Sequence, residues 1–145
     1  MLIKNALIEN SQQPQDIRIE NGLFEEIGDL EGREHEEIID LKQKLVLPPF
    51  VESHVHLDTC LTAGDPYWNM SGTLFEGIEC WSKRKEKLSR EDIRDRVHRA
   101  VQMYAANGIQ FIRTHIDVTD PSLMAMETMI ELRDELKDTA EITEA

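Results

Sequence analysis

The sequence predicts an α/β fold, in which short parallel strands alternate with helices behind a small region of β-strands. Two apolar runs, Leu45–Val51 and Ile109–Asp117, have the composition of strands, and the first reads as a strand buried on both faces. Apolar residues at helical spacing lie between the two runs and after the second. Strands that alternate with helices favour parallel pairing through right-handed crossovers. We expect residues 1–44 to form the β region and 45–145 the βα units.

The first region contains a clear hairpin signal. Asp16–Glu20 alternates polar and apolar residues, and Asn21–Gly22 separates it from the apolar-rich run Leu23–Ile27. Both turn residues tolerate a positive φ, which a two-residue hairpin turn requires. Ile38–Leu41 is a further expected strand, followed by a turn at Lys42–Gln43.

Three helices are expected in the second region. The first spans Gly72–Leu88, with Leu74, Ile78 and Trp81 on one face. The second begins after Ser89, an N-cap residue, and closes at Gly108. For the third, Asp120–Pro121 indicates an N-cap followed by proline at the first helical position. The closing run Ala140–Ala145 does not have the pattern of a strand.

Composition excludes several classes of partner. The 145 residues carry a net charge of −13, which argues against nucleic acid and against an anionic membrane surface. No run approaches the roughly 18 apolar residues that span a bilayer. Two cysteines without a spaced framework favour a reducing compartment. A cytoplasmic protein is therefore expected.

His54 and His56 carry the strongest chemical signal. Side chains alternate between the two faces of a strand, so two histidines one residue apart point the same way. Neutral imidazoles suit zinc or ferrous iron, and the pair would supply half of such a site. The alternative is two strand histidines that are satisfied by hydrogen bonds.

His115 and Asp117 form a second pair with the same spacing, at the end of the second strand. They could lie beside the metal or contact a substrate. They could equally be a polar strand end that caps the next helix. Asp58, two residues after His56, is expected to orient a loop.

These residues resemble the opening of the amidohydrolase superfamily, and more narrowly its bacterial cytosine deaminase branch. The resemblance is carried by Leu45–Pro48, His54–Asp58, Gly72–Glu79, Ala106–Ile109 and Arg113–Val118. The His-x-His motif is common to many amidohydrolases. The runs at Gly72–Glu79 and at Thr114–Asp117 are more specific to the cytosine deaminase branch.

The resemblance implies a distorted (β/α)8 barrel and a small β-sandwich built from both chain ends. It implies that His54 and His56 bind one divalent metal ion, Fe²⁺ or Zn²⁺, and that Leu74 contacts a pyrimidine base. Family members convert cytosine to uracil and ammonia with a metal-activated water. The substrate would be a small pyrimidine-type molecule, and the full-length family implies a homo-oligomer.

The chain departs from the family in length. A full barrel needs about 250 residues, and this chain is expected to supply two of eight strands. The acid–base residues of the reaction are expected beyond Ala145, so no catalytic residue is assigned here. One alternative is a sister amidohydrolase that acts on isoguanine, creatinine, a triazine or a related cyclic amide. The other is a non-catalytic remnant or binding module.

Overall fold

The computed structural model describes residues 1–144 and divides into two compact units, Met1–Pro48 and Pro49–Ala145. The junction lies at Pro48–Pro49 rather than after residue 44, because the short strand β5 (Leu45–Val46) pairs with the first strand of the chain. Within the described residues, no helix is long and apolar enough to cross a membrane.

The first unit is a five-stranded sheet. Its strands run in the order β3-β2-β1-β4, and β5 also pairs with β1. Antiparallel pairing joins β1 to β2 and β2 to β3, whereas β4 and β5 lie parallel to β1. The bounds are β1 (Leu2–Ile8), β2 (Gln15–Glu20), β3 (Leu23–Gly28) and β4 (Ile38–Asp40).

Local turn chemistry shapes this unit as expected. Asn21 and Gly22 join β2 to β3 with φ of 52° and 76°, which confirms the predicted hairpin.

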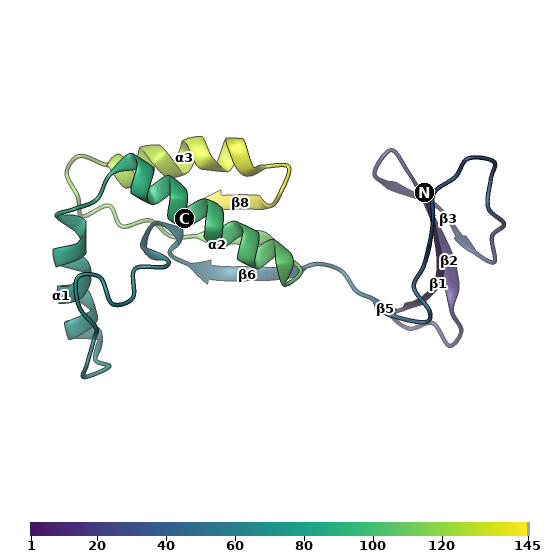
Figure 1. Ribbon diagram of the computed structural model, residues 1–145, viewed down its shortest axis with the longest axis horizontal. Helices are drawn as coiled ribbons and strands as arrows, with labels where there is room; N and C mark the ends of the chain where they lie inside the picture. Colours follow the sequence, from purple (N-terminus) through teal and green to yellow (C-terminus); the bar gives the residue numbers. More distant parts are fainter. Residues whose placement is uncertain (145) are drawn as a thin grey trace. The chain divides into compact units, whose positions relative to one another are not determined.

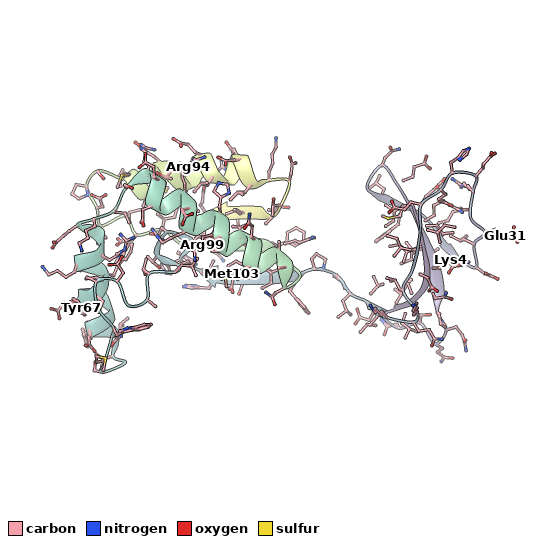
Figure 2. The ribbon with its side chains drawn as sticks, in the orientation of Figure 1. Lys4, Glu31, Tyr67, Arg94, Arg99 and Met103 are labelled. Carbon is pink, nitrogen blue, oxygen red and sulfur yellow. The ribbon has the colours of Figure 1, made fainter. Side chains whose placement is uncertain are left out.

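Buried Arg18 donates through Nε to Glu36 at 2.9 Å, and Lys4, labelled in Figure 2, donates to Asp16 at 2.7 Å. These pairs satisfy charged side chains in a unit whose buried apolar residues are Leu2, Ala6 and Ile17.

The second unit is a parallel sheet with helices on one face. The strands run in the order β6-β7-β8, and both pairings are parallel, as the alternation of elements predicts. Figure 1 shows α2 and α3 lying across the sheet and α1 beyond its end. The bounds are β6 (Phe50–Val55), η1 (Leu57–Thr59), α1 (Leu74–Lys85), α2 (Arg90–Ala106), β7 (Ile109–Thr114), α3 (Met124–Leu136) and β8 (Glu141–Glu144).

The core of this unit lies between the helices and the sheet. Alternate strand residues such as Ile112 and Ile142 point toward Val97, Val101 and Met129 on α2 and α3. Ion pairs join the helices on their outer side. One of them links Arg94, labelled on α2 in Figure 2, with Glu135.

The prediction that the first apolar run is a fully buried strand is wrong. It is divided between β5 and β6, and Phe50 and Val51 of β6 are 59% and 65% exposed. β6 is an edge strand among the described residues, and the helices pack on the face of the sheet that carries Ile112, opposite to Val51 and its partner Phe111. The apolar run therefore indicated β-structure correctly, but it did not indicate which elements of the fold pack against the strand.

Of the two helix caps predicted from the sequence, one is confirmed and one is wrong. Ser89 accepts a hydrogen bond from the Asp92 N–H, which confirms the predicted start of α2. The predicted start of α3 at Asp120–Pro121 is wrong, because that helix begins at Met124. The Asp120 carboxylate instead accepts a bond from the Ser122 N–H, and Leu123 then adopts a left-handed φ of 52°. Asp120 therefore stabilises a turn that precedes the helix and does not cap the helix.

The closing segment also differs from its prediction. Residues Glu141–Glu144 form β8, which pairs with β7 from Phe111↔Glu141 to Thr114↔Glu144. The unit thus has three parallel strands instead of the two expected. Ile142 is 4% exposed and provides the only large apolar side chain of β8, so the segment lacks the apolar run by which buried strands are recognised. Ala145 lies outside the described residues.

Candidate metal and substrate site

The ends of β6 and β7 bring three histidine rings together. His54 lies on β6, His56 follows the end of that strand, and His115 follows β7. The ring centres of His54 and His56 lie 5.6 Å apart, and both side chains are exposed to solvent. The His115 ring centre lies 4.1 Å from that of His54 and 5.6 Å from that of His56. The parallel pairing of β6 and β7 creates this cluster.

The spacing of His54 and His56 fits two ligands of one ion. With zinc–nitrogen bonds of about 2.0–2.1 Å and a tetrahedral angle, two ligating imidazoles have ring centres about 5 Å apart. The observed 5.6 Å is close to that value, whereas the 4.1 Å between His54 and His115 is shorter. Within residues 1–144, no group of three or more histidine, cysteine or acidic side chains could hold a metal ion. The pair therefore fits half of a metal site.

Hydrogen bonds fix the backbone next to His56 and His115. The His115 N–H donates to the Val55 carbonyl at 2.7 Å, which locks the end of β7 against the end of β6. The Leu57 N–H donates to the hydroxyl of buried Thr114 at 3.1 Å, which ties the chain after His56 to β7 as well. Partial loss of solvent, followed by the neighbouring His54, lowers the pKa of His115.

Asp58 is fully buried beneath the cluster. Its Oδ2 atom accepts a hydrogen bond from the Asp117 N–H at 3.0 Å, so it orients the loop that follows β7. Its Oδ1 atom has no hydrogen-bond partner among the described residues. Burial raises the pKa of the Asp58 carboxyl. The adjacent backbone is also fixed, because Arg96 donates to the carbonyl oxygens of Asp58 and Cys60 at 2.7 and 2.8 Å.

Asp117 joins the loop after β7 to helix α1. Its carboxylate accepts hydrogen bonds from Trp81 Nε1 at 2.5 Å and Lys85 Nζ at 2.8 Å, and from the backbone and hydroxyl of Thr119. Burial acts to raise the pKa of Asp117, but these donors hold it well below its usual range. Asp117 therefore does not cap α3, which was one of its two expected roles.

An open pocket of about 550 Å³ lies beside His56. Its wall includes His56, Leu74 and Asp117 together with Trp68 and Trp81. Tyr67, labelled near α1 in Figure 2, also lines it. The pocket thus places a metal-ligand candidate, the expected substrate contact and the expected neighbouring carboxylate around one space.

Two functional residues were missed at the sequence level. Trp81 was assigned to the apolar face of its helix, and Lys85 was not singled out, yet both donate to Asp117. Their separation of four residues puts them on one helix face, and that spacing was the available signal. The acidic partner lies more than 30 residues away in the chain, so nothing local identifies it.

Comparison with known proteins identifies relatives over nearly the whole chain. A model of the amidohydrolase family matches residues 37–143. The chain is 30% identical over 148 aligned residues to N-isopropylammelide isopropyl amidohydrolase of Pseudomonas sp. (strain ADP), covering 98% of this chain and 36% of that protein. The chain therefore spans little more than a third of the length of this relative.

Solved structures give the same result. A 5-methylcytosine deaminase from Klebsiella pneumoniae, liganded with phosphonocytosine, superposes with a TM-score of 0.91 and 39% identity, covering 99% of this chain and 36% of the other. N-isopropylammelide isopropylaminohydrolase from Burkholderia multivorans superposes with a TM-score of 0.78 and 27% identity, over 99% and 36% of the two chains.

Proposed function

The chain belongs to the amidohydrolase family, and we propose that it is the amino-terminal part of a metal-dependent hydrolase that deaminates cytosine or a closely related pyrimidine. The observation that carries the proposal is the paired imidazoles of His54 and His56 beside a pocket lined by Leu74. The similarity to a 5-methylcytosine deaminase over 99% of the chain supports the pyrimidine substrate.

The proposed roles follow from the geometry. His54 and His56 would hold one divalent ion, Fe²⁺ or Zn²⁺, since their rings are accessible and their spacing fits two ligands of one ion. When bound, such an ion supplies a water whose pKa is lowered to about 7, which makes hydroxide available at neutral pH. Leu74 would contact the flat apolar face of the base, and His115 and Asp117 would shape the surroundings of the ion and of the pocket.

The proposal includes the architecture of the whole enzyme. The three parallel strands β6, β7 and β8 would be the first strands of a (β/α)8 barrel, and the first unit would be part of a β-sandwich. Barrel enzymes place their chemistry at the carboxyl ends of the strands, which is where His54, His56 and His115 lie. The acid–base residues would come from the remainder of the barrel.

Metal binding is the first test. We expect the chain to bind Zn²⁺ or Fe²⁺, and the double variant His54→Ala, His56→Ala to bind it at least tenfold more weakly. Changes that merely reorient a ligand alter metal affinity by about 10–100-fold, so removing two ligands costs no less. His35, whose side chain is 90% exposed in the first unit, provides the matched control His35→Ala. Equal affinity in the double variant and the control would refute the assigned ligands.

Substrate identity is the second test. Ammonia release should be measured for the complete enzyme with cytosine, 5-methylcytosine, isoguanine and creatinine, and alkylamine release should be measured with an N-alkylammelide. We expect the pyrimidines to be the best substrates and Leu74→Ala to raise KM for cytosine by about tenfold, because a leucine contact is worth about 1.5–3 kcal/mol when fully buried. Preference for isoguanine, creatinine or the N-alkylammelide would refute the proposed pyrimidine substrate.

A second candidate function rests on a specific observation. The relative in Pseudomonas is named for action on N-isopropylammelide, and its 30% identity extends over 98% of this chain. A sister enzyme that acts on a triazine would therefore favour the alkylammelide in the panel. A protein that binds metal tightly as an oligomer and turns over none of the compounds would instead be a non-catalytic binding module.

A further inference from the structure

Helix α1 is attached to the rest of its unit almost entirely by polar contacts. Of its twelve residues, only Arg84 is buried, while Leu74, Phe75 and Ile78 are 74%, 84% and 52% exposed. Apolar packing therefore does little to fix the helix, even though it supplies Leu74, Gly77, Ile78 and Trp81 to the pocket wall. The position of this wall must depend on other contacts.

Those contacts come from the carboxyl-terminal half of the helix. Trp81 and Lys85 both donate to Asp117 Oδ2, and Lys85 also donates to the Thr119 hydroxyl at 2.5 Å. Arg84 pairs with Asp92 at the start of α2 and lies 2.8 Å from Asp65. The Lys85 and Asp117 side chains are only 23% and 15% exposed, so water screens their attraction less than at an open surface.

Asp117 is itself held rigidly. Its backbone N–H donates to the buried Asp58 carboxylate, and its Oδ1 atom accepts two bonds from Thr119. None of these contacts involves His54 or His56. The carboxylate therefore links a fixed point next to the histidine cluster with the helix that carries the far wall of the pocket.

We propose that Asp117, together with Trp81 and Lys85, is a positioning group that fixes α1 so that Leu74 faces the substrate pocket. This inference rests on the proposed function, because it assigns a purpose to the wall that Leu74 contributes. Loss of the anchor lets α1 shift relative to the histidines. Substrate affinity then falls, while the metal ligands keep their places because their own backbone contacts are intact.

The test uses the conservative variants Trp81→Phe, Lys85→Met and Asp117→Asn, each of which removes one part of the anchor. Lys83→Met is the matched control, because Lys83 lies on the same helix and its ion pair, among the described residues, is with Glu86 at the surface. In the complete enzyme, we expect KM for the preferred substrate to rise about tenfold in the three variants, as for loss of a hydrogen bond to a charged group. The value of kcat and the metal content should stay within about twofold of the wild type, and Lys83→Met should change neither constant.

A second readout is independent of turnover. Amide hydrogen exchange across Leu74–Lys85 should be faster in Trp81→Phe and Lys85→Met, whereas exchange in α2 should match the wild type in both. A double variant, Lys85→Met with Asp117→Asn, should raise KM by less than the product of the single effects, because the two residues act through one contact.

The outcomes separate this inference from the function on which it rests. A wild-type enzyme that turns over no compound of the panel would overturn the proposed function and this inference together. An active wild type in which KM and α1 exchange are the same in Lys85→Met and Lys83→Met would overturn the positioning role alone. A variant that loses metal in proportion to its activity would also overturn it, because Asp117 would then act on the ion.

Discussion

At the scale of single residues, strand alternation accounts for the central feature of the site. His54 and His56 lie two positions apart around the end of β6, and their ring centres lie 5.6 Å apart as that spacing requires. The nearness of His115 needed more than local geometry. It depends on the pairing of Val55 with Thr114 and on the bond from the His115 N–H to the Val55 carbonyl.

Residue-level electrostatics give a pH prediction for the first unit. The Arg18 guanidinium, followed by the Arg33 N–H, lowers the pKa of the Glu36 carboxyl from its ordinary value of 4.5 to about 2. A depressed pKa stabilises the folded unit at pH values above the unfolded pKa, and the contribution is lost as pH falls from about 4.5 to about 2. The urea midpoint of the first unit should therefore drop across this range.

The variant Glu36→Gln should flatten that dependence, measured from the backbone amide signals of Leu2 and Ile17 during urea titration. Glu34→Gln is the control, since the Glu34 side chain is 89% exposed and pairs at the surface with His35. If the urea midpoint changes with pH equally in the two variants between pH 2 and 4.5, the assigned ion pair is contradicted.

At the scale of elements, sequence signals predicted the structure correctly where the motif involves neighbouring residues alone. Asn21–Gly22 and Ser89 needed no distant partner, and the hairpin and the start of α2 followed from them. The helix start predicted at Asp120–Pro121 was wrong because the Asp120 carboxylate can cap either a helix or a turn. Here it accepts a hydrogen bond from the Ser122 N–H within a turn. β8 was missed because its strand character comes from pairing with β7.

The element that was missed supplies a stability prediction. Ile142 of β8 is 4% exposed and belongs to the core beside Ile112 and Met129, so Ile142→Ala should destabilise the second unit by about 2–4 kcal/mol. Thr143→Ala, at the adjacent exposed position, should cost less than about 1 kcal/mol. Thermal or urea unfolding followed by tryptophan fluorescence provides the measurement, because Trp68 and Trp81 both lie in the second unit. Equal losses in the two variants would mean that β8 does not pack on the core.

At the scale of the whole molecule, the distribution of apolar surface is uneven. The core of the second unit lies on the helix side of the sheet, while Phe50, Val51 and Phe111 are 59%, 65% and 41% exposed. β6 is an edge strand among the described residues. An exposed apolar edge strand is a template for pairing with another chain, so association of this polypeptide through β6 is expected.

A charge at this edge should suppress that association. Val51→Lys is expected to raise severalfold the protein concentration at which light scattering first increases, because edge lysines oppose strand pairing. Val118→Lys adds the same charge at a residue that is 58% exposed but lies outside every strand, so it serves as the control. If both variants raise the threshold equally, general charge and not the β6 edge governs solubility.

The sequence by itself determined the features that arise from neighbouring residues: the hairpin, the Ser89 cap of α2, the alternation of strands with helices, and the shared direction of His54 and His56. Only the tertiary structure decided which distant groups meet. It brought His115 to the paired histidines, joined Trp81 and Lys85 to Asp117, and turned residues Glu141–Glu144 into a strand. The reason is physical, since backbone geometry constrains residues a few positions apart, whereas contacts across 30 or more residues exist only once the sheet and helices have packed.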